Sequence, residues 1–133
     1  MLRLSKRVEY GLIAVRHIAA LHVGTVVTAK EISDRYHIPF DLLAKILQRL
    51  SKSGLVIAQH GVKGGYSLSK SPDQIPLSLI VNAIEGRQVV AVCISEKNED
   101  CRISETCTIK SSLFKIQNNV DQIFSTMLLS EIV

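Results

Sequence analysis

The sequence has few cysteines and no long apolar run, and both shortages limit its class. Its three cysteines, Cys93, Cys101 and Cys107, are an odd number within fifteen residues, which is a poor framework for disulfides. No apolar run approaches the roughly 20 residues that cross a bilayer. The first residues run directly into an amphipathic pattern rather than a signal peptide. We therefore expect a soluble cytoplasmic protein, in which clustered thiols stay reduced and more often serve metal or redox chemistry.

Charged residues are only 21% of the 133 residues, whereas hydrophobic residues make up 47%. This balance excludes a disordered tail protein, and the length is that of one ordinary domain with a core. The net charge of +4 is unevenly distributed. Residues 1–70 carry eleven Lys/Arg against four Asp/Glu, a balance of +7, and residues 71–133 carry five against eight, a balance of −3. We therefore expect the first part to meet an anion.

Apolar residues at helical spacing predict three helices, over residues 6–23, 28–36 and 40–53. Ser5 is a candidate N-cap of the first, and Thr28 opens the second with Glu31 in a capping box. Pro39 suits the start of the third helix. Two short helices joined by a tight turn, the second rich in Lys and Arg, indicate a helix-turn-helix, although many helical hairpins bind nothing.

A β-hairpin is expected directly after these helices. Residues 55–59 and 66–68 have strand character, and a glycine-rich turn joins them. A hairpin in this place is a wing, and its tip carries His60 and Lys63, which suits entry into a minor groove or contact with phosphates. The alternative is a hairpin that merely closes the core. The charge of residues 1–70 favours DNA binding.

The rest of the chain is expected to hold a short helix over residues 77–84, a cysteine loop and a last helix. The apolar residues of the last helix step by four, three, four, three and four, which is the spacing of a coiled-coil seam. They are Ile109, Leu113, Ile116, Val120, Ile123 and Met127. Ordinary core packing is one interpretation of this seam, and pairing with a second subunit is the one we favour. A two-fold dimer would place two recognition helices on a palindromic operator in double-stranded DNA.

The cysteines follow the spacing Cys93-x7-Cys101-x5-Cys107. Three thiolates suit an iron–sulfur cluster or zinc, and the spacing is looser than the CxxC pair of structural zinc sites. The alternative is three incidental cysteines. No histidine follows Cys93, so a fourth ligand must be a local carboxylate or a residue from elsewhere. Glu9 is a candidate, and it is otherwise an exposed first-turn residue that favours the helix dipole.

The chain resembles the Rrf2 family of winged-helix regulators over nearly its whole length. The resemblance rests on residues 4–12 (LSKRVEYGL), 47–56 (LQRLSKSGLV) and 61–68 (GVKGGYSL), together with the three-cysteine loop. It implies a mainly α fold with a small β-hairpin wing, that is, a winged helix-turn-helix followed by a long C-terminal dimerisation helix. We accordingly expect a DNA-binding domain over residues 1–70, a short helix and cluster loop over 71–108, and a dimerisation helix over 109–133. The opening residues and the longer first cysteine gap look most like the branch that regulates the SUF iron–sulfur assembly operon.

The resemblance also implies a [2Fe–2S] or [4Fe–4S] cluster held by Cys93, Cys101 and Cys107. In IscR-like members a histidine three residues after the last cysteine completes the site, and here that position is Lys110. In NsrR-like members an acid on the first helix of the partner subunit is the fourth ligand, and Glu9 matches that position. The sequence therefore favours a site shared between subunits.

The DNA contacts implied by the family lie on the second and third helices and the wing. The family's wing arginine is His60 here, and the IscR recognition-helix glutamate is Ala44. A histidine is charged only near or below a pKa of about 6.5, which predicts weaker or pH-sensitive groove binding. The expected DNA-binding residues are Thr28, Pro39, Phe40, Asp41, Lys45, Arg49, Lys52, His60 and Lys63.

Together these features predict a homodimeric, iron–sulfur-sensing transcriptional repressor of iron–sulfur assembly or stress genes, and not an enzyme. A cluster-free redox or small-effector regulator of the same fold is the main alternative. A thiol oxidoreductase is disfavoured because the chain lacks CxxC. A plain protein adaptor is disfavoured because it would not need a basic wing.

Overall fold

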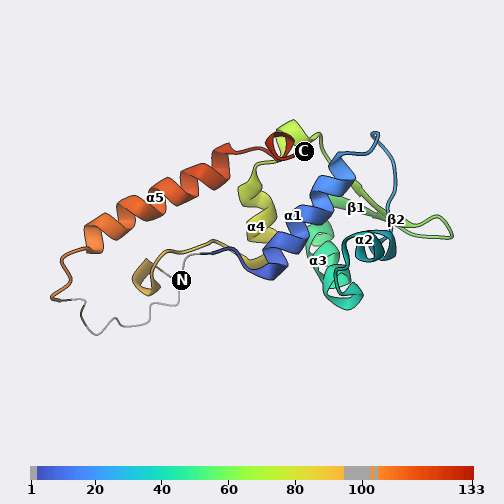
Figure 1. The fold of residues 1–133 in the computed structure, drawn as a ribbon. Helices are drawn as coiled ribbons and strands as arrows, with labels where there is room; N and C mark the ends of the chain where they lie inside the picture. Colours follow the sequence, from blue (N-terminus) through green and yellow to red (C-terminus); the bar gives the residue numbers. More distant parts are fainter. Residues whose placement is uncertain (1–2, 95–102, 104) are drawn as a thin grey trace.

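The computed structural model describes residues 3–94, 103 and 105–133. Four helices form the body of the molecule, a two-stranded hairpin projects from it, and a fifth helix extends from the other side (Figure 1). The mainly α fold with a hairpin wing is thus confirmed. The helices and strands are α1 (Lys6–Ala19), α2 (Ala29–Tyr36), α3 (Phe40–Lys52), β1 (Val56–Gln59), β2 (Gly65–Leu68), α4 (Leu77–Glu85) and α5 (Lys110–Thr126). Short 3-10 turns lie at η1 (Pro72–Gln74), η2 (Val92–Ile94) and η3 (Leu129–Glu131).

The first helix begins where the sequence predicts and ends earlier. Ser5 caps α1 by accepting a hydrogen bond from the backbone N–H of Val8 at 3.3 Å. The helix stops at Ala19 instead of residue 23. Ile18 is the last buried residue of α1, Ala19 and Leu21 pack only partly against the core, and Val23 is fully exposed. Helical stability in proteins comes mostly from packing an apolar face, so the helix ends where the burial of that face declines.

The core lies between α1, α3 and α4. Gly11 on α1 lies so close to α4 that an added Cβ would stand 2.2 Å from Cδ1 of Ile84. Leu129, beyond α5 in sequence, is fully buried in the same core. The core therefore draws on segments from both sides of residue 70. Its largest fully buried apolar side chains are Ile32, Leu43, Ile46, Leu47, Leu50, Ile75, Ile80, Ile84, Leu129, Val8 and Val15.

The wing is tied to the helix-turn-helix by one additional backbone bridge. The two strands pair antiparallel, with Val56 opposite Leu68 and Gln59 opposite Gly65. Val27, which precedes α2, forms a bridge with Tyr66 through two backbone hydrogen bonds of 2.9 and 2.7 Å. Because Thr28 then caps α2, the start of that helix and strand β2 are joined through adjacent backbone residues.

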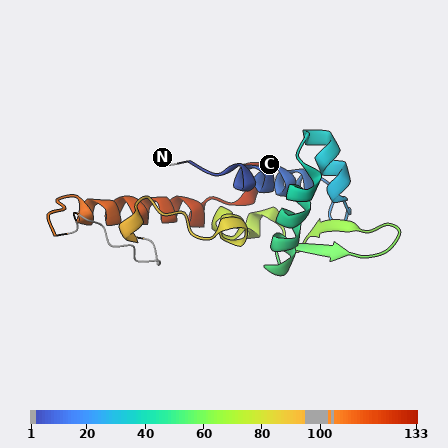
Figure 2. The same ribbon diagram turned by 90° about the horizontal axis from the view of Figure 1, so that it is seen from below.

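Helix α5 and the wing lie at opposite ends of the molecule (Figure 2). Helix α5 has 17 residues and contacts α4 near the C-terminal end of α5, where Phe124 packs against the core. Ile109 and Met127, the two ends of the predicted seam, are the residues that flank the helix. Neither α5 nor any other helix in the described part of the chain is long and apolar enough to cross a membrane.

His17 joins α1 to α2 and makes the stability of this contact sensitive to pH. Its Nδ1 lies 2.7 Å from the hydroxyl of Tyr36, and the two rings meet edge to face. Burial lowers the pKa of His17 below its usual 6.5, and the charge of Arg35 lowers it further, while Glu31 acts in the opposite direction. Because the pKa of His17 is lower in the folded state, the unfolded chain takes up the proton first as the pH falls. The contribution of His17 to folding stability is therefore present above pH 6.5 and is lost as the pH falls below it.

We therefore expect the midpoint temperature of thermal unfolding to decrease as the pH is lowered from about 7.5 to about 5.5. The reason is that His17 must become charged in a partly buried place. A His17→Gln variant should show a flatter pH dependence over this interval. The matched control is His60→Gln, which removes an exposed histidine at the wing tip and should leave the slope unchanged. Equal slopes for the wild-type chain and His17→Gln would contradict this assignment.

Candidate nucleic-acid interface and sensing region

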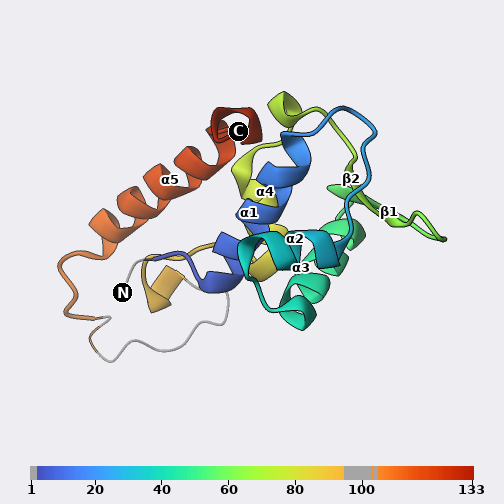
Figure 3. The same ribbon diagram turned by 45° about the vertical axis from the view of Figure 1, so that its right-hand side comes forward.

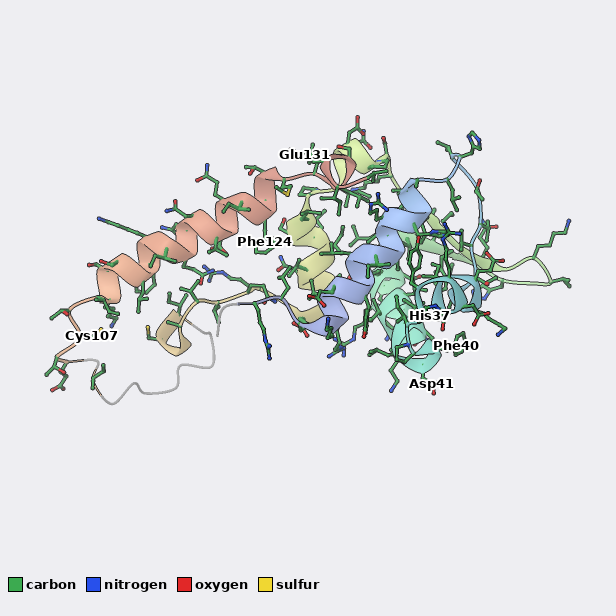
Figure 4. All side chains as sticks on the ribbon, in the orientation of Figure 1. His37, Phe40, Asp41, Cys107, Phe124 and Glu131 are labelled. Carbon is green, nitrogen blue, oxygen red and sulfur yellow. The ribbon has the colours of Figure 1, made fainter. Side chains whose placement is uncertain are left out.

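Helix α3 separates a buried apolar face from an exposed polar face. Leu43, Ile46, Leu47 and Leu50 are fully buried. The expected DNA-binding residues of this helix are all exposed, and Figure 4 shows Phe40 and Asp41 at the N-terminal end of α3, pointing away from the body. They are Phe40, Asp41, Lys45, Arg49 and Lys52.

Two features of this face were not expected from the sequence. The Nη1 of Arg49 donates to the backbone carbonyl of Ile84 at 2.7 Å, near the C-terminus of α4. The side chain that we expect to contact phosphate therefore also fastens α3 to α4. Gln48 is exposed between Lys45 and Lys52 on the same face. The 3.6-residue period that joins Asp41, Lys45 and Lys52 also includes Gln48, whose amide suits the adenine edge.

The remaining expected DNA contacts lie at the ends of helices and in the wing. The hydroxyl of Thr28 accepts a hydrogen bond from the backbone N–H of Glu31 at 3.1 Å and keeps its own proton to donate to a phosphate. Pro39 is the exposed N-cap of α3. His60 and Lys63 are exposed in the loop between β1 and β2, where Val62 is also fully exposed. The loop that carries His60 and Lys63 thus projects away from the body, as Figure 3 shows for the hairpin.

The structure describes two of the three predicted cysteine ligands. Cys93 lies in η2 and Cys107 lies two residues before the N-cap of α5 (Figure 4). Both are half-buried free thiols. Cys101 lies outside the described residues. Two thiolates on segments that enter and leave the cysteine loop, with a third between them in sequence, have the donor chemistry that an iron–sulfur cluster requires.

Glu9, the candidate fourth ligand, lies on α1 and is half-exposed. Its carboxylate pairs with Nζ of Lys6 at 2.9 Å, and this exposed pair raises the pKa of Lys6. Nearby, Oγ of Ser5 donates to the carboxylate of Glu85 at 2.5 Å. Among the residues that the structure describes, no three His, Cys, Asp or Glu side chains gather as a metal site would require. Within one protomer, then, Glu9 does not join the two described cysteines.

Helix α5 presents an apolar stripe to solvent. Ile109, Ile116 and Ile123 are spaced seven residues apart and are 56, 47 and 57% exposed. Leu113 and Val120, between them, are half-buried. Met127, just beyond the helix, is also exposed. All six residues of the predicted seam therefore lie at or near the surface of the single chain.

One side chain on the inner side of α5 is polar and completely buried. The Oε1 of Gln117 accepts from the N–H of Val90 at 2.8 Å, and its Nε2 donates to the carbonyl of Gln88 at 2.8 Å and to Asp121 at 2.9 Å. Arg87 donates twice to the same Asp121 carboxylate, at 2.6 and 3.3 Å. This guanidinium, with help from Gln117, lowers the pKa of Asp121, so the carboxyl remains ionised.

The profile of the Rrf2 family, described as an iron-dependent transcriptional regulator, matches residues 4–133. The chain belongs to the Rrf2 family. Members of this family are DNA-binding transcriptional regulators and not enzymes, and they bind DNA typically as dimers. The protein is therefore a transcriptional regulator, as the winged helix and the basic first part of the chain predict.

Solved Rrf2 structures have the same fold. The global cysteine regulator CymR (YrzC) of B. subtilis is 24% identical, with a TM-score of 0.77, and the match covers 99% of this chain and 96% of CymR. T. potens IscR is 24% identical, with a TM-score of 0.73 over 98% of this chain and 85% of IscR. A putative transcriptional regulator from Listeria innocua is 19% identical, with a TM-score of 0.81 over 98% and 85%. These similarities concern the fold alone.

Proposed function

We propose that this Rrf2 regulator is a homodimeric repressor that senses iron–sulfur status through Cys93, Cys101 and Cys107. The observation that carries the proposal is the position of Cys107, two residues before the cap of a helix with an uncovered apolar stripe. Ligands at the start of the dimerisation helix couple the occupancy of the cysteines to how that helix is held. The regulated genes are those of iron–sulfur assembly or of stress responses.

The DNA-binding surface in this proposal consists of the exposed side of α3, the start of α2 and the wing tip. Lys45 and Lys52 are exposed and form no ion pair with a described residue, so their charges are available to phosphates or base edges. A duplex binder of this kind loses affinity steeply with salt, because each neutralised phosphate releases counterions. Palindromic DNA matches a two-fold protein dimer.

The stripe on α5 is proposed to pair with the same stripe of a second copy. Val120 and Ile123 also line an apolar depression with Leu4 and Phe124. Pairing through α5 would cover both features. The fourth ligand is proposed to be the partner's Glu9, since Glu9 does not join the described cysteines of its own chain.

The three cysteines and Glu9 have the donor chemistry to hold the cluster, which, when bound, supplies a redox- and oxygen-sensitive centre. The chain itself connects the ligands to the helices. Residues 86–91 join the end of α4 to the turn that contains Cys93, and Cys107 lies shortly before the start of α5. Ligation through both thiolates would fix the ends of the cysteine loop to each other. Such a constraint changes DNA affinity only if the two dimer states bind DNA differently.

The test is anaerobic purification followed by absorption and Mössbauer spectroscopy, with gel shifts on the protein's own upstream DNA. We expect a visible spectrum and a change in DNA affinity of about 5–150-fold between cluster-bound and cluster-free protein. Cys107→Ala should lose the cluster and bind DNA like the cluster-free wild type. Glu9→Gln should alter the spectrum while retaining iron, and Glu31→Gln, an exposed acid on α2, serves as its control.

Equal DNA affinity of the two forms would overturn sensing through the cluster. An unchanged spectrum and unchanged cluster stability in Glu9→Gln would remove Glu9 from the ligand set. Circular dichroism of the cysteine and glutamate variants will show whether each has the native fold, so that misfolding is not mistaken for either outcome.

A second candidate is a cluster-free redox or small-effector regulator of the same fold. The similarity to CymR, a cysteine regulator, favours it. Absence of iron and acid-labile sulfide after anaerobic purification, together with DNA binding that responds to thiol oxidation, would support this candidate over the first.

A further inference from the structure

The segment 87–94 carries Cys93 and runs along the inner side of α5. Its backbone is held at two positions by one side chain, since Gln117 accepts from the N–H of Val90 and donates to the carbonyl of Gln88. At the far end of the segment the side chain of Ile94 is buried. Cys93 therefore lies between a backbone position that Gln117 holds and a buried side chain.

Gln117 is suited to this task because both ends of its amide are hydrogen-bonded and the side chain is completely buried. The carbonyl oxygen accepts one hydrogen bond and the amino group donates two, to Gln88 and to Asp121. A buried amide that loses its partners is strongly unfavourable, so each of the three bonds helps to keep this side chain and its partners in place. A glutamine in the middle of a helix would otherwise be expected to face solvent.

The ion pair beside it adds a second connection. Asp121 accepts from both Gln117 and Arg87, so the start of the segment and its middle are bound to the same turn of α5. Arg87 follows Gly86, where α4 ends. The three side chains thus form a continuous polar bracket between the end of α4, the segment that leads to Cys93 and the dimerisation helix.

We propose that Gln117, supported by Asp121 and Arg87, positions Cys93 relative to α5. Gln117 is a positioning residue rather than a ligand. The inference deepens the proposed function, on which it rests for the role of Cys93 as a ligand. In this arrangement a change at Cys93 is transmitted to α5 through the backbone of residues 88–90 and the Gln117 amide.

The first test uses reduced, metal-free protein and measures alkylation of individual cysteines by iodoacetamide, with mass spectrometry as the readout. Gln117→Met keeps the length and helix propensity of the side chain and removes all three hydrogen bonds. We expect the alkylation rate of Cys93 to rise about tenfold, because two part-buried backbone groups lose their partners and the segment opens. The rate at Cys107, which this bracket does not hold, should remain within about twofold.

Two further variants should change the alkylation rate of Cys93 less than Gln117→Met does. Asp121→Ala removes the Arg87 pair and one of the Gln117 bonds and should give a smaller rise at Cys93. Asn118→Ala changes the exposed neighbour of Gln117 on the same helix and should give none. An unchanged Cys93 rate in Gln117→Met overturns the proposal. Equal rises at Cys93 and Cys107 overturn it as well, since they indicate general loosening of the chain rather than release of one segment.

The second test uses the protein as purified anaerobically and separates this proposal from the proposed function. If the protein holds a cluster, Gln117→Met should change its visible circular dichroism and speed its loss to a chelator, while Asn118→Ala should do neither. If no variant, wild type included, holds a cluster, the proposed function fails, and the alkylation result still decides whether Gln117 positions Cys93. A cluster that is unaffected by Gln117→Met contradicts the proposal.

Discussion

Replacing Gly65 with alanine should destabilise the protein by about 2–4 kcal/mol and weaken DNA binding of the chain that remains folded. Gly65 opens β2 with φ of 153°, and a Cβ there would stand 2.6 Å from the backbone oxygen of Val27 and 2.7 Å from Cγ1 of Val26. A backbone oxygen in a hydrogen-bonded bridge has little room to move. The substitution therefore forces apart the bridge between Val27 and Tyr66.

Loss of this bridge should affect DNA binding because the bridge sets the position of the wing. Val27 directly precedes Thr28, the cap of α2, so the wing and the helix-turn-helix share one backbone connection. Thermal unfolding measures the stability change, and hydrogen exchange at the amide of Tyr66 measures the local one. Gel shifts at a temperature where the variant is folded measure the effect on DNA.

The matched control is Gly61→Ala in the same hairpin. Gly61 has φ of 113°, and a Cβ there would meet nothing within 4 Å. This variant should show only the cost of the backbone conformation, about 1–2 kcal/mol, and an intact bridge. If Gly65→Ala is no less stable than Gly61→Ala and Tyr66 keeps its protection, the close contact with Val27 does not hold the wing.

The helix-turn-helix and the wing could be predicted because their signals are local. Ser5 and Thr28 both accept the expected hydrogen bonds from the first turns of their helices. The predicted third helix and both strands agree with the structure to within one residue at each end. The resemblance of residues 61–68 to a wing was supported by the same glycine spacing that the hairpin requires.

What sequence patterns missed depends on contacts between distant parts of the chain. Val27 and Tyr66 are bridged although nothing in their neighbourhoods marks them as partners. Leu129 fills the core from beyond the last helix, and Arg49 fastens α3 to α4 through a backbone carbonyl that has no sequence signature.

Within the candidate site, too, the sequence predicts the local patterns and not the contacts between distant residues. The seam on α5 followed from the spacing of apolar residues, and its isoleucines are exposed as an unpaired stripe would be. Sequence patterns do not predict the role of Gln117, because a glutamine within an amphipathic helix is expected at the surface. Only its three hydrogen bonds to residues 88, 90 and 121 reveal why it is buried. The cysteine spacing favoured a cluster, and Cys101 lies outside the described residues.

If the proposed dimer pairs through α5, a charge placed in the α5 stripe should convert it to a monomer. Ile123 is 57% exposed in the single chain, so Ile123→Glu leaves the fold of the protomer intact. In a dimer paired through α5 the same carboxylate would be buried against apolar side chains, at a cost of several kcal/mol. We expect the dimer dissociation constant to rise about 10³-fold, as measured by sedimentation, with an unchanged far-ultraviolet circular dichroism spectrum.

The affinity for operator DNA should decrease when Ile123→Glu prevents dimer formation. A preformed dimer presents its second half-site reader at a high effective concentration, an advantage worth about 10²–10⁴ in affinity. Ile123→Glu should lose most of this factor on a palindromic operator and little on a single half-site. Gln122→Glu is the matched control, because it adds the same charge at the next residue, which is exposed and lies off the stripe. If Ile123→Glu sediments as the wild type does, the two copies do not pair through this stripe, and the proposed link between Cys107 and the dimer interface has no mechanical basis.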